Sequence, residues 1–317
     1  MRRTDPLVLL ALGGMALAPA GTAAAQQAWL PPKGEASLSL GFSHAFASEH
    51  VDYQGNPVAP GDMLWNNVVA DLGYGVTDRF AVRLTLPPLV TSKYGGTFAH
   101  PPQPGHTNLD DGAWHSTFQD FRTEVRFRAT RGATVVTPFA ALIVPSHGYE
   151  YYGHPAAGRD LVEGQVGVAV GRLLDPVLPN AYVQVRYLLG IPEKVQGMSH
   201  DRSQLSLDVG YLIGSAFTAR FLGLWQKSYG GWRAPIDWPA PTSIQYVAHD
   251  QLEREDYLQL GGAVSYALSG SVDINLFGYS TVRARSYVDM SGVGLSFTYS
   301  ASPAQLIRKK RGEKTSP

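Results

Sequence analysis

The chain of 317 residues carries 26 basic and 26 acidic side chains, so its formal net charge of zero gives no electrostatic reason to expect a nucleic-acid partner. It contains no cysteine, which excludes disulfide bonds, thiolate metal sites and thiol nucleophiles. Only 16% of the residues are charged while 34 are glycine and 16 tyrosine, a balance that favours an all-β chain, and no break in composition divides it into two domains.

The first 25 residues have the features of a secretory signal peptide. Arg2 and Arg3 precede an apolar run over residues 7–17, and small residues at 23–25 precede Gln26. The residues after the arginine pair do not continue a twin-arginine signal, so general secretion is the preferred interpretation. We expect cleavage after residue 25. No later stretch of about eighteen apolar residues occurs, so any membrane span must consist of strands.

The mature chain alternates apolar and polar residues with the period of two that is typical of β-strands. The hairpin 201–228 shows this best, because Leu205, Leu207 and Val209 alternate with polar residues before a turn at 214–215 and a second alternating leg. About twelve strands are predicted, many of them longer than ordinary globular strands. They lie near residues 35–46, 63–74, 80–86, 120–128, 134–145, 161–173, 181–191, 204–211, 217–226, 258–268, 272–276 and 290–299.

The predicted connections are short and long in turn. Turns such as 77–78, 131–132 and 269–270 contrast with long loops, chiefly 91–115 and 229–253. An even number of strands with short periplasmic turns and long extracellular loops is the layout of an outer-membrane β-barrel. A soluble β-sandwich would show the same alternation with its faces exchanged, but the strand lengths, the connections and the aromatic residues near strand ends favour the barrel.

If the apolar face meets lipid, the other face encloses a lumen that contains ionisable side chains. Such residues at membrane depth must pair with one another or meet water, and they are candidates for setting solute selectivity. The alternative is a salt-bridged network that only maintains the shape of the barrel, because twelve strands lie between filled barrels and open porins. The residues are Asp71, Arg83, Asp120, Arg122, Glu124, Arg126, Glu163, Arg186, Asp208, Arg220 and Asp273.

Nine histidines all map to the outer loops or to the adjacent strand ends. Their spacing matches no metal-ligand motif, so we interpret them as polar loop residues and predict no metal site and no cofactor. The pairs His115-Ser116 and His249-Asp250 could be fragments of a hydrolase triad. Neighbours on one strand point to opposite faces, however, so these pairs are not expected to hydrogen-bond, and no enzyme is predicted.

Three stretches carry a resemblance to a known family: residues 109–126, which include Trp114 and His115, the segment 30–35, and the turn at 74–79. Together they resemble the family of outer-membrane proteins associated with the MetA pathway of phenol degradation. The resemblance spans most of the mature chain and implies a barrel that passes small molecules, aromatic or otherwise apolar, without catalytic residues. The basic tail 301–317 departs from this pattern.

We therefore expect a signal peptide (1–25), a transmembrane barrel (26–300) and a basic tail (301–317) in a monomer of the Gram-negative outer membrane. Its expected partners are outer-membrane lipid, the barrel assembly machinery and a small solute. The long loops are expected to gate the mouth, where solute contacts would come from Trp114, His115, Trp232 and Trp238. The alternatives are a structural or adhesive barrel with a plugged lumen and, less favoured, a lipid-modifying enzyme.

Overall fold

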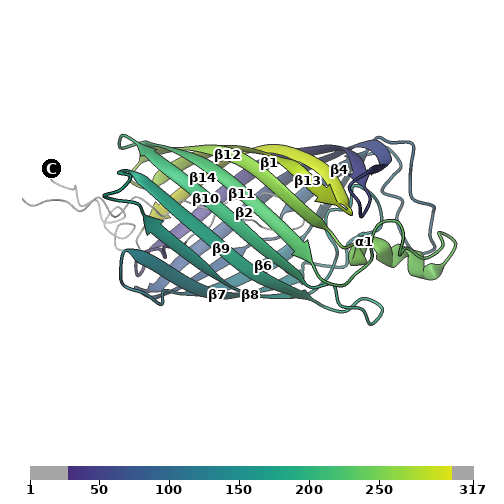
Figure 1. The fold of residues 1–317 in the computed structure, drawn as a ribbon, viewed down its shortest axis with the longest axis horizontal. Helices are drawn as coiled ribbons and strands as arrows, with labels where there is room; N and C mark the ends of the chain where they lie inside the picture. Colours follow the sequence, from purple (N-terminus) through teal and green to yellow (C-terminus); the bar gives the residue numbers. More distant parts are fainter. Residues whose placement is uncertain (1–27, 302–317) are drawn as a thin grey trace, which may run out of the picture.

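The computed structural model describes residues 28–301, which form one antiparallel sheet closed into a barrel (Figure 1). The expected signal peptide, and the expected tail apart from Ala301, lie outside this range. The strands are β1 (Ala36–Val51), β2 (Pro57–Thr77), β3 (Phe80–Thr85), β4 (Leu89–Tyr94), β5 (His115–Phe118), β6 (Asp120–Phe127), β7 (Thr134–Pro145), β8 (Glu163–Leu173), β9 (Ala181–Pro192), β10 (Arg202–Ile213), β11 (Phe217–Ser228), β12 (Asp256–Ser269), β13 (Val272–Arg285) and β14 (Tyr287–Ala301).

The barrel has twelve transmembrane strands, because two of them are each broken into two segments. β2 pairs with both β3 and β4, while β6 pairs with β3 and β5 pairs with β4. Strand β1 pairs with β2 on one side and with β14 on the other, which closes the sheet and leaves no free edge. The predicted closed all-β barrel of about twelve strands is confirmed.

The breaks in the two neighbouring strands lie at the same level of the wall. Pro87 and Pro88 have no backbone N–H to donate, and the strand resumes as β4, within a stretch that we had predicted as loop. Beside them Gln119 separates β5 from β6, and its backbone N–H donates to the Pro88 carbonyl at 2.9 Å. Phe118 and Phe121 both face outward across this step, so the break shifts the period of two by one residue.

The outer face of the barrel is apolar. Large apolar side chains on every second position are exposed, for example Phe42 at 48%, Val166 at 51% and Leu276 at 59% of their surface. The alternate positions, such as Gln165 and Asn275, are buried inside. A soluble sandwich would bury the first set in its core, so this distribution identifies a transmembrane barrel rather than a sandwich.

The two ends of the barrel differ. One end, here called the turn end, has the connections 78–79, 128–133, 174–180, 214–216 and 270–271. The other, the loop end, has the long connections 95–114, 146–162, 193–201 and 229–255, the last of which contains η2 (Ile244–Ala248) and α1 (His249–Leu252) (Figure 1). No helix in residues 28–301 is long and apolar enough to cross a bilayer.

Two predicted outer loops are shorter than expected. The connection between β1 and β2 is only 52–56, and Ser286 alone separates β13 from β14. The Asp52 carboxylate accepts the backbone N–H groups of Gln54 and Asn56 at 2.7 and 2.8 Å, which closes a tight turn. This turn lets the β1–β2 ladder extend beyond the strands predicted at 35–46 and 63–74.

The apolar outer face gives a first prediction. Phe42 lies on β1 between Leu295 and Val68 of the neighbouring strands, and Phe42→Arg would place a charge among acyl chains. We expect the free energy of unfolding in lipid vesicles to fall by about 2–4 kcal/mol, measured by urea titration of tryptophan fluorescence. Phe42→Leu is the matched control. An arginine tolerated as well as leucine would contradict the lipid-facing orientation.

Candidate functional site

The lumen contains a cluster of three arginines around one glutamate. Strand β6 directs Arg122, Glu124 and Arg126 inward at alternate positions, and Arg186 reaches the same carboxylate from β9. Glu124 pairs with Arg122, with Arg186 at 2.6 Å and with Arg126 at 3.5 Å, and all four side chains are buried. Because one carboxylate faces three guanidinium groups, this cluster carries excess positive charge.

Further ion pairs line the same surface. Arg83 pairs with Asp71 at 2.9 Å, and Arg220 pairs with Asp208 at 2.6 Å. Glu163 pairs at 2.6 Å with Arg202, a residue that the sequence analysis missed. Arg202 keeps the alternation of the inward residues of β10, so extending that strand by two residues would have found it.

The structure places all eleven predicted lumen residues on the inner face. Seven are buried and four are half-buried, and nine of them belong to the ion pairs just described. The other two are Asp120, which accepts a hydrogen bond from the Tyr149 hydroxyl at 2.8 Å, and Asp273, which pairs in register with the buried, inward-facing Thr298. Their role in selectivity remains a prediction.

The start of the described chain enters the lumen at the turn end. The Ala28 N–H donates to Gln184 at 2.9 Å, and the Ala28 carbonyl accepts from the Thr137 hydroxyl. Trp29 meets Tyr182 edge to face, with ring centroids 6.0 Å apart. Ala28 is fully buried, so this segment narrows the lumen. No feature of the sequence pattern predicted it.

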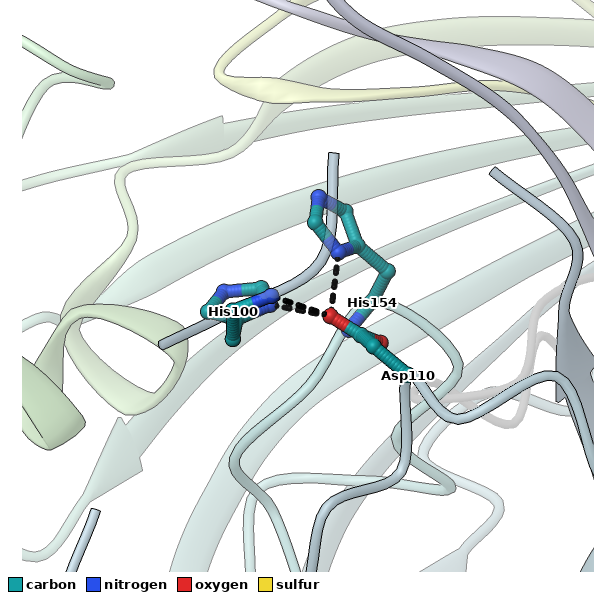
Figure 2. Close-up of side chains that lie close together, drawn as sticks. All are labelled: His100, Asp110 and His154. Carbon is teal, nitrogen blue, oxygen red and sulfur yellow. Dashed lines mark hydrogen bonds and ion pairs between the residues drawn. The ribbon is translucent and has the colours of Figure 1, made fainter. Parts of the chain in front are cut away.

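The mouth at the loop end contains a cluster of histidines and carboxylates drawn from three loops. Figure 2 shows His100 and His154 directed at Asp110. The Nδ1 atoms of the two rings lie 2.6 and 2.8 Å from Asp110 Oδ2. Burial alone would raise the pKa of the Asp110 carboxyl, but hydrogen bonds from both histidines hold it well below its usual range. Asp110 is therefore an ionised acceptor.

His249 extends this cluster from α1. Its Nε2 lies 2.9 Å from His100 Nε2 and 3.2 Å from Asp250 Oδ1, while its Nδ1 lies 2.6 Å from the Tyr246 carbonyl. Asp250 also accepts the Gly153 N–H at 2.9 Å. Two combinations, His100–Asp110–His154 and His100–His249–Asp250, have donor atoms close enough to hold a metal ion. The histidines are loop residues, as predicted, but the sequence did not show that they meet, because the three loops converge only in the folded chain.

A cavity of about 110 Å³ lies beside this cluster. Its walls combine charged groups with aromatic rings and a methionine, among them His50, Trp65, Trp238, Glu253, Tyr287 and Met290. The cavity therefore has both apolar and polar walls.

Of the four predicted mouth contacts, only Trp238 lines this cavity. Its ring centroid lies 4.3 Å from that of His249. Trp114 is 49% exposed, and His115 bonds Asp111 at 2.9 Å. The backbone N–H of Trp232 donates to the Leu252 carbonyl at 2.7 Å.

Within residues 28–301, neither of the two fragments that were considered for a hydrolase triad forms a hydrogen bond between a nucleophile and a base. Ser116 bonds Thr91 at 2.8 Å rather than His115. His249 and Asp250 do interact, contrary to expectation, because they lie on a helix and not on a strand. The nitrogen of His249 that approaches Asp250 also faces His100, so the surroundings are those of a ligand cluster rather than of a base beside a nucleophile.

A groove marks the outer wall at the strand breaks. It has a volume of about 700 Å³ and is lined by Val68, Leu86, Pro87, Leu89, Phe118 and Phe121 among others. The exposed members of this set belong to the lipid-facing surface. The interruption of β3/β4 and β5/β6 therefore creates an apolar recess in the wall.

A closed antiparallel sheet with an apolar exterior and an ionic interior defines the class of transmembrane β-barrels. Comparison of the sequence with protein-family models gives no match, and neither does comparison with curated proteins. Among solved structures, the crystal structure of the COG4313 outer membrane channel from Pseudomonas putida F1 is similar, with a TM-score of 0.66 and 11% identity over 87% of this chain and 98% of that chain. The translocator domain of the autotransporter NalP from Neisseria meningitidis has a TM-score of 0.47 and 10% identity over 84% of this chain and 88% of that one. The first likeness shows the outer-membrane barrel fold.

Proposed function

We propose that this protein is a channel of the Gram-negative outer membrane that passes small solutes, aromatic or otherwise apolar. The observation that carries the proposal is the closed barrel, whose inner face carries buried ionisable residues and whose loop end contains a cavity. The similar solved structure is itself described as an outer membrane channel. The turn end then faces the periplasm and the loop end faces the exterior.

Two features support apolar or aromatic solutes. The mouth cavity presents Trp65, Trp238, Tyr287 and Met290 to an entering molecule. The recess at Pro87 offers an apolar surface on the lipid side of the wall. The resemblance to the family associated with the MetA pathway of phenol degradation points to the same class of solute.

The arginine cluster predicts anion preference. Each of two lumen charges acting over about 10 Å of water contributes roughly 0.4 kcal/mol to the energy of a passing ion. Removal of both charges costs an anion roughly 0.8 kcal/mol and favours a cation by the same amount. Arg122→Ala with Arg126→Ala should therefore lower the anion-to-cation permeability ratio by about 15-fold, measured as the reversal potential in planar bilayers under a salt gradient. Arg131→Ala, at an exposed position in the turn end, is the control. An unchanged ratio would show that the cluster does not face the conduction path.

One observation favours a second function. The Ala28–Trp29 segment and the ion pairs fill part of the lumen, as expected of a structural or adhesive barrel with a plug. Swelling of liposomes that contain the purified protein distinguishes the two. Entry of phenol and small sugars supports a channel, whereas no entry of either, with folded protein verified by its heat-modifiable gel migration, supports the plugged barrel.

A further inference from the structure

The His100–His249 contact at the mouth presents a problem of hydrogen-bond chemistry. His249 Nδ1 lies 2.6 Å from the Tyr246 carbonyl, which can only accept, so this nitrogen carries the proton. His100 Nδ1 lies 2.6 Å from Asp110 Oδ2, which also accepts the backbone N–H of His100 at 2.8 Å, so this nitrogen carries its proton for the same reason. In the neutral rings both Nε2 atoms therefore present lone pairs, yet they lie only 2.9 Å apart.

Two lone pairs at this distance repel unless a cation lies between or beside them. The Asp250 carboxylate completes the arrangement, with Oδ1 at 3.2 Å from His249 Nε2 and Oδ2 at 3.7 Å from His100 Nε2. Ligand atoms on one tetrahedral zinc ion are about 3.3 Å apart, given bonds of about 2.0–2.1 Å. The two Nε2 atoms, 2.9 Å apart, and the two oxygens of the Asp250 carboxylate, at 3.2 and 3.7 Å from them, thus need to move by only about 0.4 Å to reach that spacing around one ion.

The groups behind these ligands are those expected of a metal site. Ligating histidines usually donate their other N–H to a carboxylate or a carbonyl, which fixes the tautomer and the ring orientation. Asp110 does this for His100, and the Tyr246 carbonyl does it for His249. The Gly153 N–H bonds Asp250 Oδ2 at 2.9 Å and orients the third ligand.

We propose that His100, His249 and Asp250 bind one divalent transition-metal ion of the zinc class at the extracellular mouth. Two imidazoles and one carboxylate favour zinc, copper or nickel over calcium and magnesium, which prefer oxygen ligands. His100, His249 and Asp250 all line the mouth cavity, so a fourth coordination position would be open to it.

The bound ion would also fix the outer loops relative to one another. His100 and Asp110 come from the loop 95–114, His249 and Asp250 from the loop 229–255, and Gly153 and His154 from the loop 146–162. His100 is far in sequence from His249 and Asp250, which explains why no spacing motif predicted the site.

Equilibrium dialysis of Zn²⁺ against the untagged, chelator-treated protein in detergent tests the proposal. We expect one ion per chain with a Kd of about 1 µM or tighter, and visible absorption bands of four-coordinate Co²⁺ on substitution. His249→Gln and Asp250→Asn should each weaken binding by at least about 100-fold, and Asp110→Asn, behind the ligands, by roughly 10- to 100-fold. His147→Gln, at an exposed loop histidine, is the matched control and should bind as the wild type does.

Folding of each variant is verified by heat-modifiable gel migration. A Kd of the wild-type protein for zinc weaker than about 100 µM would overturn the proposal. The close approach of the two Nε2 atoms would then be explained by a proton shared between them. Equal zinc binding by His249→Gln and the wild type would also overturn it. Since the wild-type measurement needs no variant, a variant that does not fold leaves the test decisive.

Discussion

Deletion of residues 28–31 is expected to raise the single-channel conductance of the purified protein several-fold. These residues include Ala28 and Trp29, which occupy the lumen at the turn end and bond Gln184, Thr137 and Arg126 on the barrel wall. Their removal takes a backbone segment and an indole ring out of the conduction path. The measurement is conductance in planar bilayers, with swelling of liposomes in small sugars as a second readout.

The deletion leaves the wall of the barrel intact. The turn at Pro32 and Glu35, which meets β2 through the Gly34–Gly75 and Gly75–Glu35 hydrogen bonds, is retained. Lys33→Ala, at an exposed position in the same segment, is the control and should not change conductance. A deletion variant with wild-type conductance would mean that the constriction lies elsewhere, at the arginine cluster or under the outer loops.

Substitution of Glu124 by glutamine is expected to lower the free energy of unfolding by about 3–5 kcal/mol, because it removes the only carboxylate of a buried group that contains three arginines. Arg122, Arg126 and Arg186 would then lose the carboxylate that they share, and their like charges would repel one another. The check is urea-induced unfolding in lipid vesicles followed by tryptophan fluorescence. Asp78→Asn, in the exposed turn between β2 and β3, should leave the midpoint unchanged.

A second variant separates lost charge from lost packing. Glu124→Gln combined with Arg186→Met removes one cation together with the anion, while the methionine keeps an apolar contact with Phe139, over which the Arg186 guanidinium lies at 3.7 Å. We expect this pair to recover part of the lost stability. If Glu124→Gln alone lowers the free energy of unfolding by less than about 1 kcal/mol, water screens the charges of the cluster as it does in surface ion pairs.

The strands and their inward faces could be predicted from the sequence because alternation is a local property. Leu205 and Asp208 lie on opposite faces whatever the strand pairs with, so the outward and inward sets follow from the period of two. The breaks at Pro87 and Gln119 were missed for the same reason. A one-residue shift in period resembles the end of a strand when the pairing partners are unknown.

The sequence by itself determined the barrel, its approximate strand number and the ionisable residues of its lumen, since each depends on side-chain alternation and turn residues within a short stretch. Only the tertiary structure decided which charges pair, that Ala28 and Trp29 enter the lumen, and that His100, Asp110, His154, His249 and Asp250 meet at the mouth. The long-range contacts among these join residues 44 to 156 positions apart. Closure of the barrel sets them by fixing the loop ends in a ring, and no local pattern records that geometry.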